Sequence, residues 1–374
     1  MEYKKSIYSL YYDWWKNIDK FIFSLIILLF ITGLFFSLVS TSLLVSDKLE
    51  TNDYEFFFKH LSFVFLGILI IFILSSINEE KLFKISPLIF LLSLFSLFLV
   101  PIIGVEVNSA QRWIDLYFLP RFQPIELVKP FLIILISLIL SNEKHNNIFF
   151  KYLFSFLITL MIALLLAAQP DIGQTLLVFF SWSVLIFVSG INIIFLITSC
   201  FILSIILYFS IRFIPKFEYI KNRILSFFNT ETGTHNAQSE KAIDSITSGG
   251  FFGKGIGEGT LKNRVPEAHT DYIISVISEE FGVIAIILIL LLFLIFIYSV
   301  FKKVYLENED RIKLVLVGCT SLILVQTMIH IGVNIRLFPT TGMTLPFISY
   351  GGSSIISISI LSGIILNLTK RKIN

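Results

Sequence analysis

Polar residues that could do chemistry gather in the segment Pro-Glu-Ala-His-Thr-Asp, residues 266–271, directly before a long apolar run. A carboxylate at Asp271 would stand at a helix N-terminus, where it can cap backbone N–H groups and is favoured by the helix dipole. The same carboxylate could act as a general base toward a substrate hydroxyl in an outer cavity. Spacing alone leaves both roles open for Asp271 and its polar neighbours His269 and Thr270. His269 and Asp271 could also ligate a metal, but no further His or Cys cluster supports a metal site.

Two more carboxylates, Glu279 and Glu280, follow about two helical turns after Asp271. At most one of them can share the helix face of Asp271. The other is expected to pair with a base from a neighbouring helix.

A second candidate is the run Gln-Pro-Ile-Glu-Leu-Val-Lys, residues 123–129. Its proline suits the first turn of a helix. Glu126 and Lys129 are three residues apart, so they share a helix face and can form an ion pair. Ionisable residues inside a membrane span are costly and usually face the protein interior, a cavity or each other. The pair, with Gln123 beside it, is open to two compatible interpretations: a structural ion pair, or the polar floor of an outward cavity.

Single polar residues stand on either side of this run. Arg112 precedes Trp113, a combination that suits either a lipid headgroup anchor or contact with a substrate pyrophosphate. Asp171 follows Gln169 and Pro170, and it most simply caps the next helix, because Asp is a favoured N-cap residue.

A glycine-rich run, residues 249–259, could expose backbone N–H groups to phosphate oxygens. It matches neither a Walker A loop nor a dinucleotide fingerprint, so a flexible surface loop is the alternative. The basic residues Lys254, Lys262 and Arg264 favour an anionic headgroup as its ligand.

A last polar run, residues 339–354, holds two prolines, Gly342, Ser349 and Tyr350. It predicts a re-entrant or broken entry to the last helix. The small residues 351–354 permit close helix packing, which is the simpler interpretation of this run beside a role at a substrate site.

The elements that must position these residues are membrane helices. Hydrophobic residues make up 56% of the 374-residue chain, and mean hydropathy is +0.86. Charged residues make up 15%, well below the roughly 25% of soluble domains. The fold class is therefore an all-α polytopic membrane protein. A span needs about 20 apolar residues, and ten candidates meet that need: 21–45, 56–77, 83–104, 124–141, 148–168, 171–190, 192–214, 272–301, 312–337 and 345–369.

Ten spans place both termini on one side, and Lys and Arg are concentrated there, so this side is predicted to be cytoplasmic. We expect one membrane domain over residues 1–374. It has a cytoplasmic N-terminus over 1–20, one large outer loop over 215–271 between the seventh and eighth spans, and a cytoplasmic C-terminus over 370–374. Function should lie at or just beneath the outer face.

Taken in order, the segments QPIELVKP, QPDIG, QSEKAIDSITSGGFFGKGIGEG, PEAHTDYIISVISEEFG and PTTGMTLPFISYGGSS resemble the SEDS family (FtsW/RodA). The last of them is more similar to FtsW, the division member, than to RodA, the elongation member. Ile125, Ser109 and Tyr272 depart from the usual pattern, and none of them replaces an ionisable residue.

The resemblance implies an inverting glycosyltransferase that polymerises lipid II on the outer face of the bacterial cytoplasmic membrane, at the division septum. It implies Asp271 as the essential acidic residue and Glu126 and Lys129 as a sensitive polar pair. In the expected reaction, Asp271 takes the proton of the acceptor hydroxyl, and Lys129, Arg112, Lys254, Lys262 and Arg264 are candidates to stabilise the pyrophosphate that leaves.

A class B penicillin-binding protein (transpeptidase) and other division proteins are the implied partners. No cofactor is evident, although a divalent cation could assist, and no nucleic acid is expected. Three alternatives stay open: a RodA-like enzyme of elongation, a lipid II flippase, and a noncatalytic scaffold for a transpeptidase. Polarity concentrated on the outer side favours an enzyme over a flippase, which needs a continuous polar path.

Overall fold

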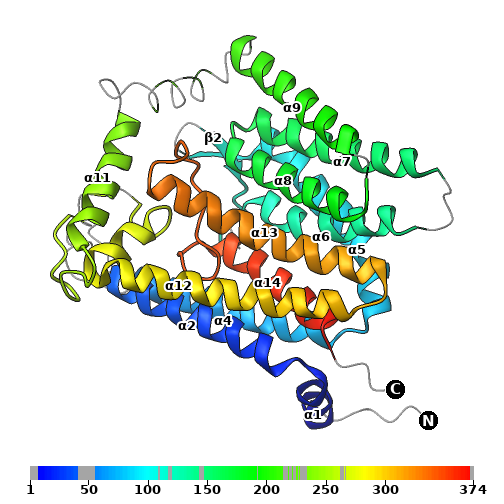
Figure 1. Cartoon of the computed structure of the whole chain (residues 1–374), viewed down its shortest axis with the longest axis horizontal. Helices are drawn as coiled ribbons and strands as arrows, with labels where there is room; N and C mark the ends of the chain where they lie inside the picture. Colours follow the sequence, from blue (N-terminus) through cyan, green and yellow to red (C-terminus); the bar gives the residue numbers. More distant parts are fainter. Residues whose placement is uncertain are drawn as a thin grey trace.

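The protein, described by a computed structural model, is a bundle of helices that run roughly side by side (Figure 1). The structure describes residues 7–40, 55–107, 110–116, 120–142, 147–191, 193–213, 234–261 and 267–370, together with residues 218, 221, 225, 227 and 265. Within these ranges it is all-α apart from one short hairpin. The polytopic fold predicted from the sequence is confirmed.

Each of the ten predicted spans corresponds to one helix. These are α2 (Lys20–Ser40), α4 (Glu55–Ser76), α5 (Glu79–Ile103), α6 (Pro124–Leu140), α7 (Ile148–Ala168), α8 (Ile172–Val188), α9 (Ile193–Phe213), α12 (Ile273–Leu306), α13 (Asp310–Asn334) and α14 (Gly352–Leu368). Among the described residues, six helices are long and apolar enough to cross a membrane, namely α2, α4, α5, α7, α12 and α13. The chain is therefore a multi-pass membrane protein.

Three further elements stand at the two ends of this bundle. Helix α1 (Ile7–Asn17) lies beside the termini, and α11 (Thr234–Gly249) lies at the opposite end (Figure 1). A hairpin joins α5 to α6 through strands β1 (Val105–Val107) and β2 (Ala110–Trp113), which pair antiparallel. The start of α2 and the end of α14 lie at the same end of the bundle (Figure 1).

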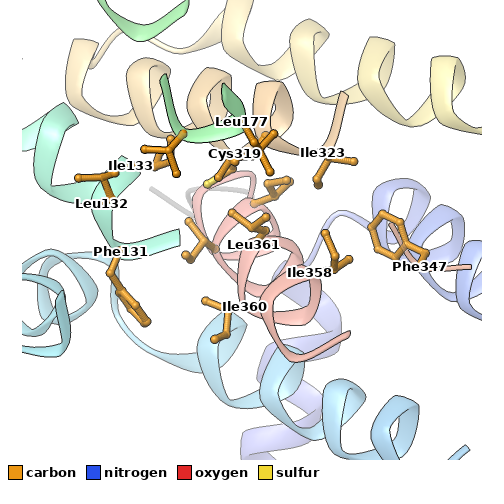
Figure 2. Close-up of a cluster of buried hydrophobic side chains, with 14 of the residues drawn as sticks. Phe131, Leu132, Ile133, Leu177, Cys319, Ile323, Phe347, Ile358, Ile360 and Leu361 are labelled. Atoms are coloured by element: carbon orange, nitrogen blue, oxygen red, sulfur yellow. The ribbon is translucent and has the colours of Figure 1, made fainter. Parts of the chain in front are cut away.

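Helix α14 forms the centre of the core, where nearly all of its residues are buried. Figure 2 shows its side chains Ile358, Ile360 and Leu361 among apolar side chains of α6, α8 and α13. Small residues let α4 approach it closely: a methyl group on Gly67 would lie 2.3 Å from Ser359 Oγ. Close helix packing is also predicted for the small residues 351–354. It is confirmed at Gly352, where a methyl group would overlap the Phe63 ring.

The last predicted span, 345–369, begins later than expected, at Gly352. Residues 335–351 are mostly non-helical, with positive φ angles at Gly342 (72°) and Phe347 (65°). The predicted broken entry to the last helix is confirmed. Its consequence is that most of residues 343–349 are buried in the bundle, beside the turn that precedes α12.

Candidate active site

Asp271 lies in a tight turn, which we call the Asp271 turn (Glu267–Tyr272). The Glu267 backbone has φ 53°, and its carbonyl accepts hydrogen bonds from the N–H groups of Thr270, Asp271 and Tyr272 at 3.1–3.3 Å. The N-cap of α12 is Tyr272, with no side-chain capping bond. Asp271 therefore stands one residue before the cap, and its side chain is half-buried.

Three consecutive carbonyl groups of this turn accept hydrogen bonds from the end of α13 and the segment that follows. The Tyr350 backbone N–H donates to His269 O at 3.1 Å. Ser349 Oγ donates to Thr270 O at 2.7 Å, and Asn334 Nδ2 donates to Asp271 O at 3.0 Å. The backbone beneath the Asp271 carboxylate is therefore fixed by residues about 60 to 80 positions later in the chain.

Arg112 approaches the same place from strand β2. A methyl group built on Gly342 would lie 3.6 Å from Asp271 Oδ2 and 4.0 Å from Arg112 Nη1. Gly342 thus lies close to both a carboxylate and a guanidinium group. Its φ of 72° is also one that glycine adopts without strain.

Arg112 itself is held by the turn between α7 and α8. It donates to the carbonyls of Gln169 and Pro170, and its Nε lies 3.6 Å from Asp171 Oδ2. Its side chain is only 17% exposed, which disagrees with the interpretation as a lipid headgroup anchor. The structure places Arg112 beside Asp171 and Gly342 instead.

Asp171 is the N-cap of α8, as predicted, and accepts from the Gln174 N–H at 3.3 Å. Its other oxygen accepts from Gln123 Nε2 at 3.0 Å. The Gln123 backbone N–H in turn donates to Ser353 Oγ at 3.0 Å. Asp171 therefore caps the start of α8 and also joins α8 to α6 and to Arg112.

Beneath Asp171 lies a buried triad, Glu126, Lys129 and Gln174. Lys129 Nζ lies 2.9 Å from both carboxylate oxygens of Glu126 and donates to Gln174 Oε1 at 3.0 Å. Gln174 Nε2 completes the ring by donating to Glu126 Oε1 at 2.8 Å. All three side chains are at least 95% buried. The predicted Glu126–Lys129 pair is confirmed, and at this burial Lys129 supports the site from below rather than reaching a phosphate.

The glycine-rich run does not form the phosphate cradle or the free loop considered from the sequence. Its N–H groups at Gly253, Lys254 and Gly255 are bonded to the carbonyls of Gly249, Glu279 and Glu280 at 2.8–3.1 Å. It packs on α12 so closely that a methyl group on Gly249 would lie 1.8 Å from the Ser278 carbonyl oxygen. These backbone donors are engaged within the protein and are not available to a ligand.

Lys254 in this run donates to Glu279 Oε1 at 3.2 Å. The base that pairs with Glu279 therefore comes from the glycine-rich run, and the expectation of a base from a neighbouring helix is wrong for this residue. Lys262 and Arg264, the two other predicted headgroup ligands, lie outside the described residues.

The His269 ring packs against the Phe56 ring in a tilted arrangement, with ring centroids 4.7 Å apart. Tyr350 lies against both rings at 5.8 and 6.1 Å. Burial lowers the pKa of His269, and nearby Glu267 opposes this only in part. Among the described residues no group of three or more His, Cys, Asp or Glu side chains is placed to hold a metal ion.

Two residues of the site were missed by the sequence analysis. Gln174 and Asn334 are single amides at the ends of apolar helices, three residues after the Asp171 cap and at the last residue of α13. A polar side chain in the end turn of an apolar helix was the available signal. Their partners, Glu126 and Asp271, lie 48 and 63 positions away and are set only by the fold.

Comparison with known proteins gives a consistent result over nearly the whole chain. The model of the FtsW/RodA/SpoVE family, described as "Cell cycle protein", matches residues 19–374. A relative from Wigglesworthia glossinidia brevipalpis, described as "Probable peptidoglycan glycosyltransferase FtsW", is 33% identical over 370 residues, which is 96% of this chain and 93% of that protein. A relative from Enterococcus hirae with the same description is 32% identical, with 96% and 94% covered.

Solved structures agree with this result. The rod shape determining protein RodA of Thermus thermophilus is 25% identical, with a TM-score of 0.69 over 94% of this chain and 96% of that one. A chain of a peptidoglycan synthase complex shares the fold at 24% identity, with a TM-score of 0.74 over 94% and 97% of the two chains. The Asp271 turn, the buried triad and the bundle of apolar helices thus occur together in a chain that belongs to the FtsW/RodA/SpoVE family of cell cycle proteins.

Proposed function

We propose that this chain is a peptidoglycan glycosyltransferase, closer to FtsW than to RodA, which joins two lipid II molecules on the outer face of the membrane. The observation that carries the proposal is that the Asp271 carboxylate and the Arg112 guanidinium both lie close to Gly342, at 3.6 and 4.0 Å from a methyl group built there. A base and a fixed cation close to one position suit a displacement that creates negative charge on its leaving group.

In the proposed reaction, the 4-hydroxyl of the acceptor GlcNAc attacks C1 of the donor MurNAc. Asp271 accepts the hydroxyl proton, the bond from C1 to the pyrophosphate oxygen breaks, and undecaprenyl pyrophosphate leaves with the bonding electrons. Inversion converts the α-linked donor into a β-1,4 product. Arg112, tied to Asp171 and two carbonyl groups, would stabilise the pyrophosphate charge without having to reorganise.

The other predicted residues take supporting roles in this proposal. The buried triad fixes Asp171 and therefore Arg112, while Ser349, Tyr350 and Asn334 fix the Asp271 turn. Among the basic residues named from the sequence, Lys254 is engaged by Glu279. The contacts of Arg112 with Gln169, Pro170 and Asp171 run through Nε and Nη2, and its Nη1 is the atom nearest Gly342, which supports Arg112 as a contact of the pyrophosphate.

We further propose that the protein acts in the bacterial cytoplasmic membrane at the division septum, with both termini cytoplasmic, together with a class B penicillin-binding protein. The FtsW relatives favour the septum over the side wall. The shared fold with a chain of a peptidoglycan synthase complex favours a transpeptidase partner.

The test is polymerisation of fluorescently labelled lipid II by the purified protein in vesicles, with its transpeptidase partner present. Wild type should form glycan strands, and Asp271→Asn should lose about 10²- to 10⁴-fold in rate, the usual contribution of a general base. Asp271→Asn keeps the size of the side chain, so its thermal unfolding should match wild type. Equal rates in the two proteins would remove Asp271 as the base, and lipid scrambling without polymer would favour a flippase.

A further inference from the structure

Helix α12, one of the apolar helices long enough to cross a membrane, is broken at Gly282. This residue has φ 74° and ψ −178°, an extended backbone in a region that side chains disfavour. The break separates a short outer segment, residues 273–281, from the long remainder of the helix. Helix ends leave carbonyl and N–H groups without partners in the helix, and such groups are costly inside a bilayer unless protein satisfies them.

The glycine-rich run supplies those partners from both sides of the break. Its Lys254 and Gly255 N–H groups donate to the carbonyls of Glu279 and Glu280, at 2.8 and 3.1 Å. In the other direction, the Val283 N–H donates to Gly250 O at 3.0 Å. Glycine is required for this contact, because a methyl group on Gly253 would lie 2.1 Å from the Glu280 carbonyl oxygen.

Glu279 lies at the centre of this contact and is completely buried. One carboxylate oxygen accepts from the Leu261 N–H at 2.9 Å and from Lys254 Nζ at 3.2 Å. The other accepts from Ser245 Oγ, on α11, at 2.9 Å. A single side chain on the outer segment of α12 therefore binds three points of the large outer loop through charge-assisted hydrogen bonds, which are the strong class.

The outer segment of α12 begins directly after the Asp271 turn. Glu279 is eight residues from Asp271, or about 12 Å along a helix. We infer that Glu279 is a positioning residue for glycosyl transfer: by fastening the glycine-rich run to the outer segment of α12, it holds the Asp271 carboxylate at the position from which it acts. This inference rests on the proposed function.

The experiment measures kcat and KM for lipid II together with amide hydrogen exchange of residues 249–261. Glu279→Gln keeps the size of the side chain and one acceptor but loses the charge that holds Lys254. A base displaced by a fraction of an ångström to 1 Å can cost up to about 100-fold in rate. We expect kcat to fall 10- to 100-fold on that scale, KM to stay within about twofold, and exchange of the Lys254 and Gly255 amides to quicken.

Glu258→Gln is the matched control, because it removes an exposed carboxylate from the same run; it should leave all three measurements unchanged. Gly253→Ala breaks the same contact from the side of the glycine-rich run. It is the second test variant, to be used if Glu279→Gln does not fold. It should lower kcat in the same way. Normal kcat in either variant, or a lower kcat with unaltered amide exchange, would overturn the inference. Failure of wild type to polymerise lipid II would instead overturn the proposed function.

Discussion

The Asp271 turn and the buried triad belong to one polar region but are built from different contacts. Ser349, Tyr350 and Asn334 hold the turn through hydrogen bonds to its backbone carbonyls. These bonds position the Asp271 carboxylate through the backbone and not through the carboxylate oxygens. In the triad, the charged atoms of Glu126 and Lys129 bind each other and Gln174. The first arrangement fixes the backbone beneath a carboxylate, whereas the second uses its charges to hold helices together.

This difference predicts that damage to the triad lowers stability first, and damage to the turn lowers rate first. Asp171 and Arg112 lie between the two regions and should show both effects. The variants that follow separate the two kinds of damage.

Lys129→Met should have the largest effect. It leaves the Glu126 carboxylate buried without its cation, and breaking a buried pair in this way costs about 3–5 kcal/mol. Thermal unfolding in detergent or vesicles should show a large loss of stability, with activity lost in parallel. Glu126→Gln/Lys129→Met removes both charges and should recover most of the stability. A double variant as unstable as the single one would contradict this account of the triad.

Arg112→Gln should have the next largest effect. A hydrogen bond to a charged group contributes about 1.5–3 kcal/mol, so kcat/KM for lipid II should fall roughly 10- to 100-fold on that scale, with only a modest loss of stability. Arg121→Gln is the control. Arg121 pairs with Asp115 at a largely exposed position just before α6. An equal fall in both variants would point to general charge attraction rather than to Arg112.

Ser349→Ala removes one of the three bonds to the Asp271 turn. The loss of one neutral hydrogen bond costs about 1 kcal/mol of stability. We expect kcat to fall by about 10-fold or more. This is a larger effect than the loss of stability, because a small displacement of a general base lowers the rate strongly. Ser354→Ala is the control, since the Ser354 hydroxyl accepts a hydrogen bond from Thr344, which lies outside the Asp271 turn. A change in stability without a change in kcat would contradict the assignment.

His269 gives the smallest predicted effect, through pH. Burial lowers the pKa of His269 in the folded protein below the usual histidine value of about 6.5. The unfolded chain therefore binds a proton more readily than the folded protein as the pH falls through about 6.5. The stability contributed by neutral His269 is fully present above that pH and is lost below it. His269→Gln should flatten the fall in melting temperature between pH 7 and pH 5, and an unchanged slope would show that His269 does not contribute.

Much of the fold could be predicted because membrane spans depend on local sequence. An apolar run of sufficient length forms a helix in lipid whatever surrounds it, since only a helix satisfies its own backbone there. The same local logic identified the Asp171 cap, the Glu126–Lys129 pair three residues apart, and the broken entry to α14. The match to motifs along the chain identified Asp271, which spacing alone had left between two roles.

What only the tertiary structure decided is which distant groups meet. Sequence spacing could not show that Gln174 closes the triad, that Asn334 and Ser349 hold the Asp271 turn, or that the glycine-rich run closes the break in α12. Each of these contacts joins segments about 20 to 80 residues apart. The chain by itself determined the helices and the residue types at their ends. Packing of α14 among its neighbours brought those ends together, because hydrogen bonds between distant segments form only after the helices are placed.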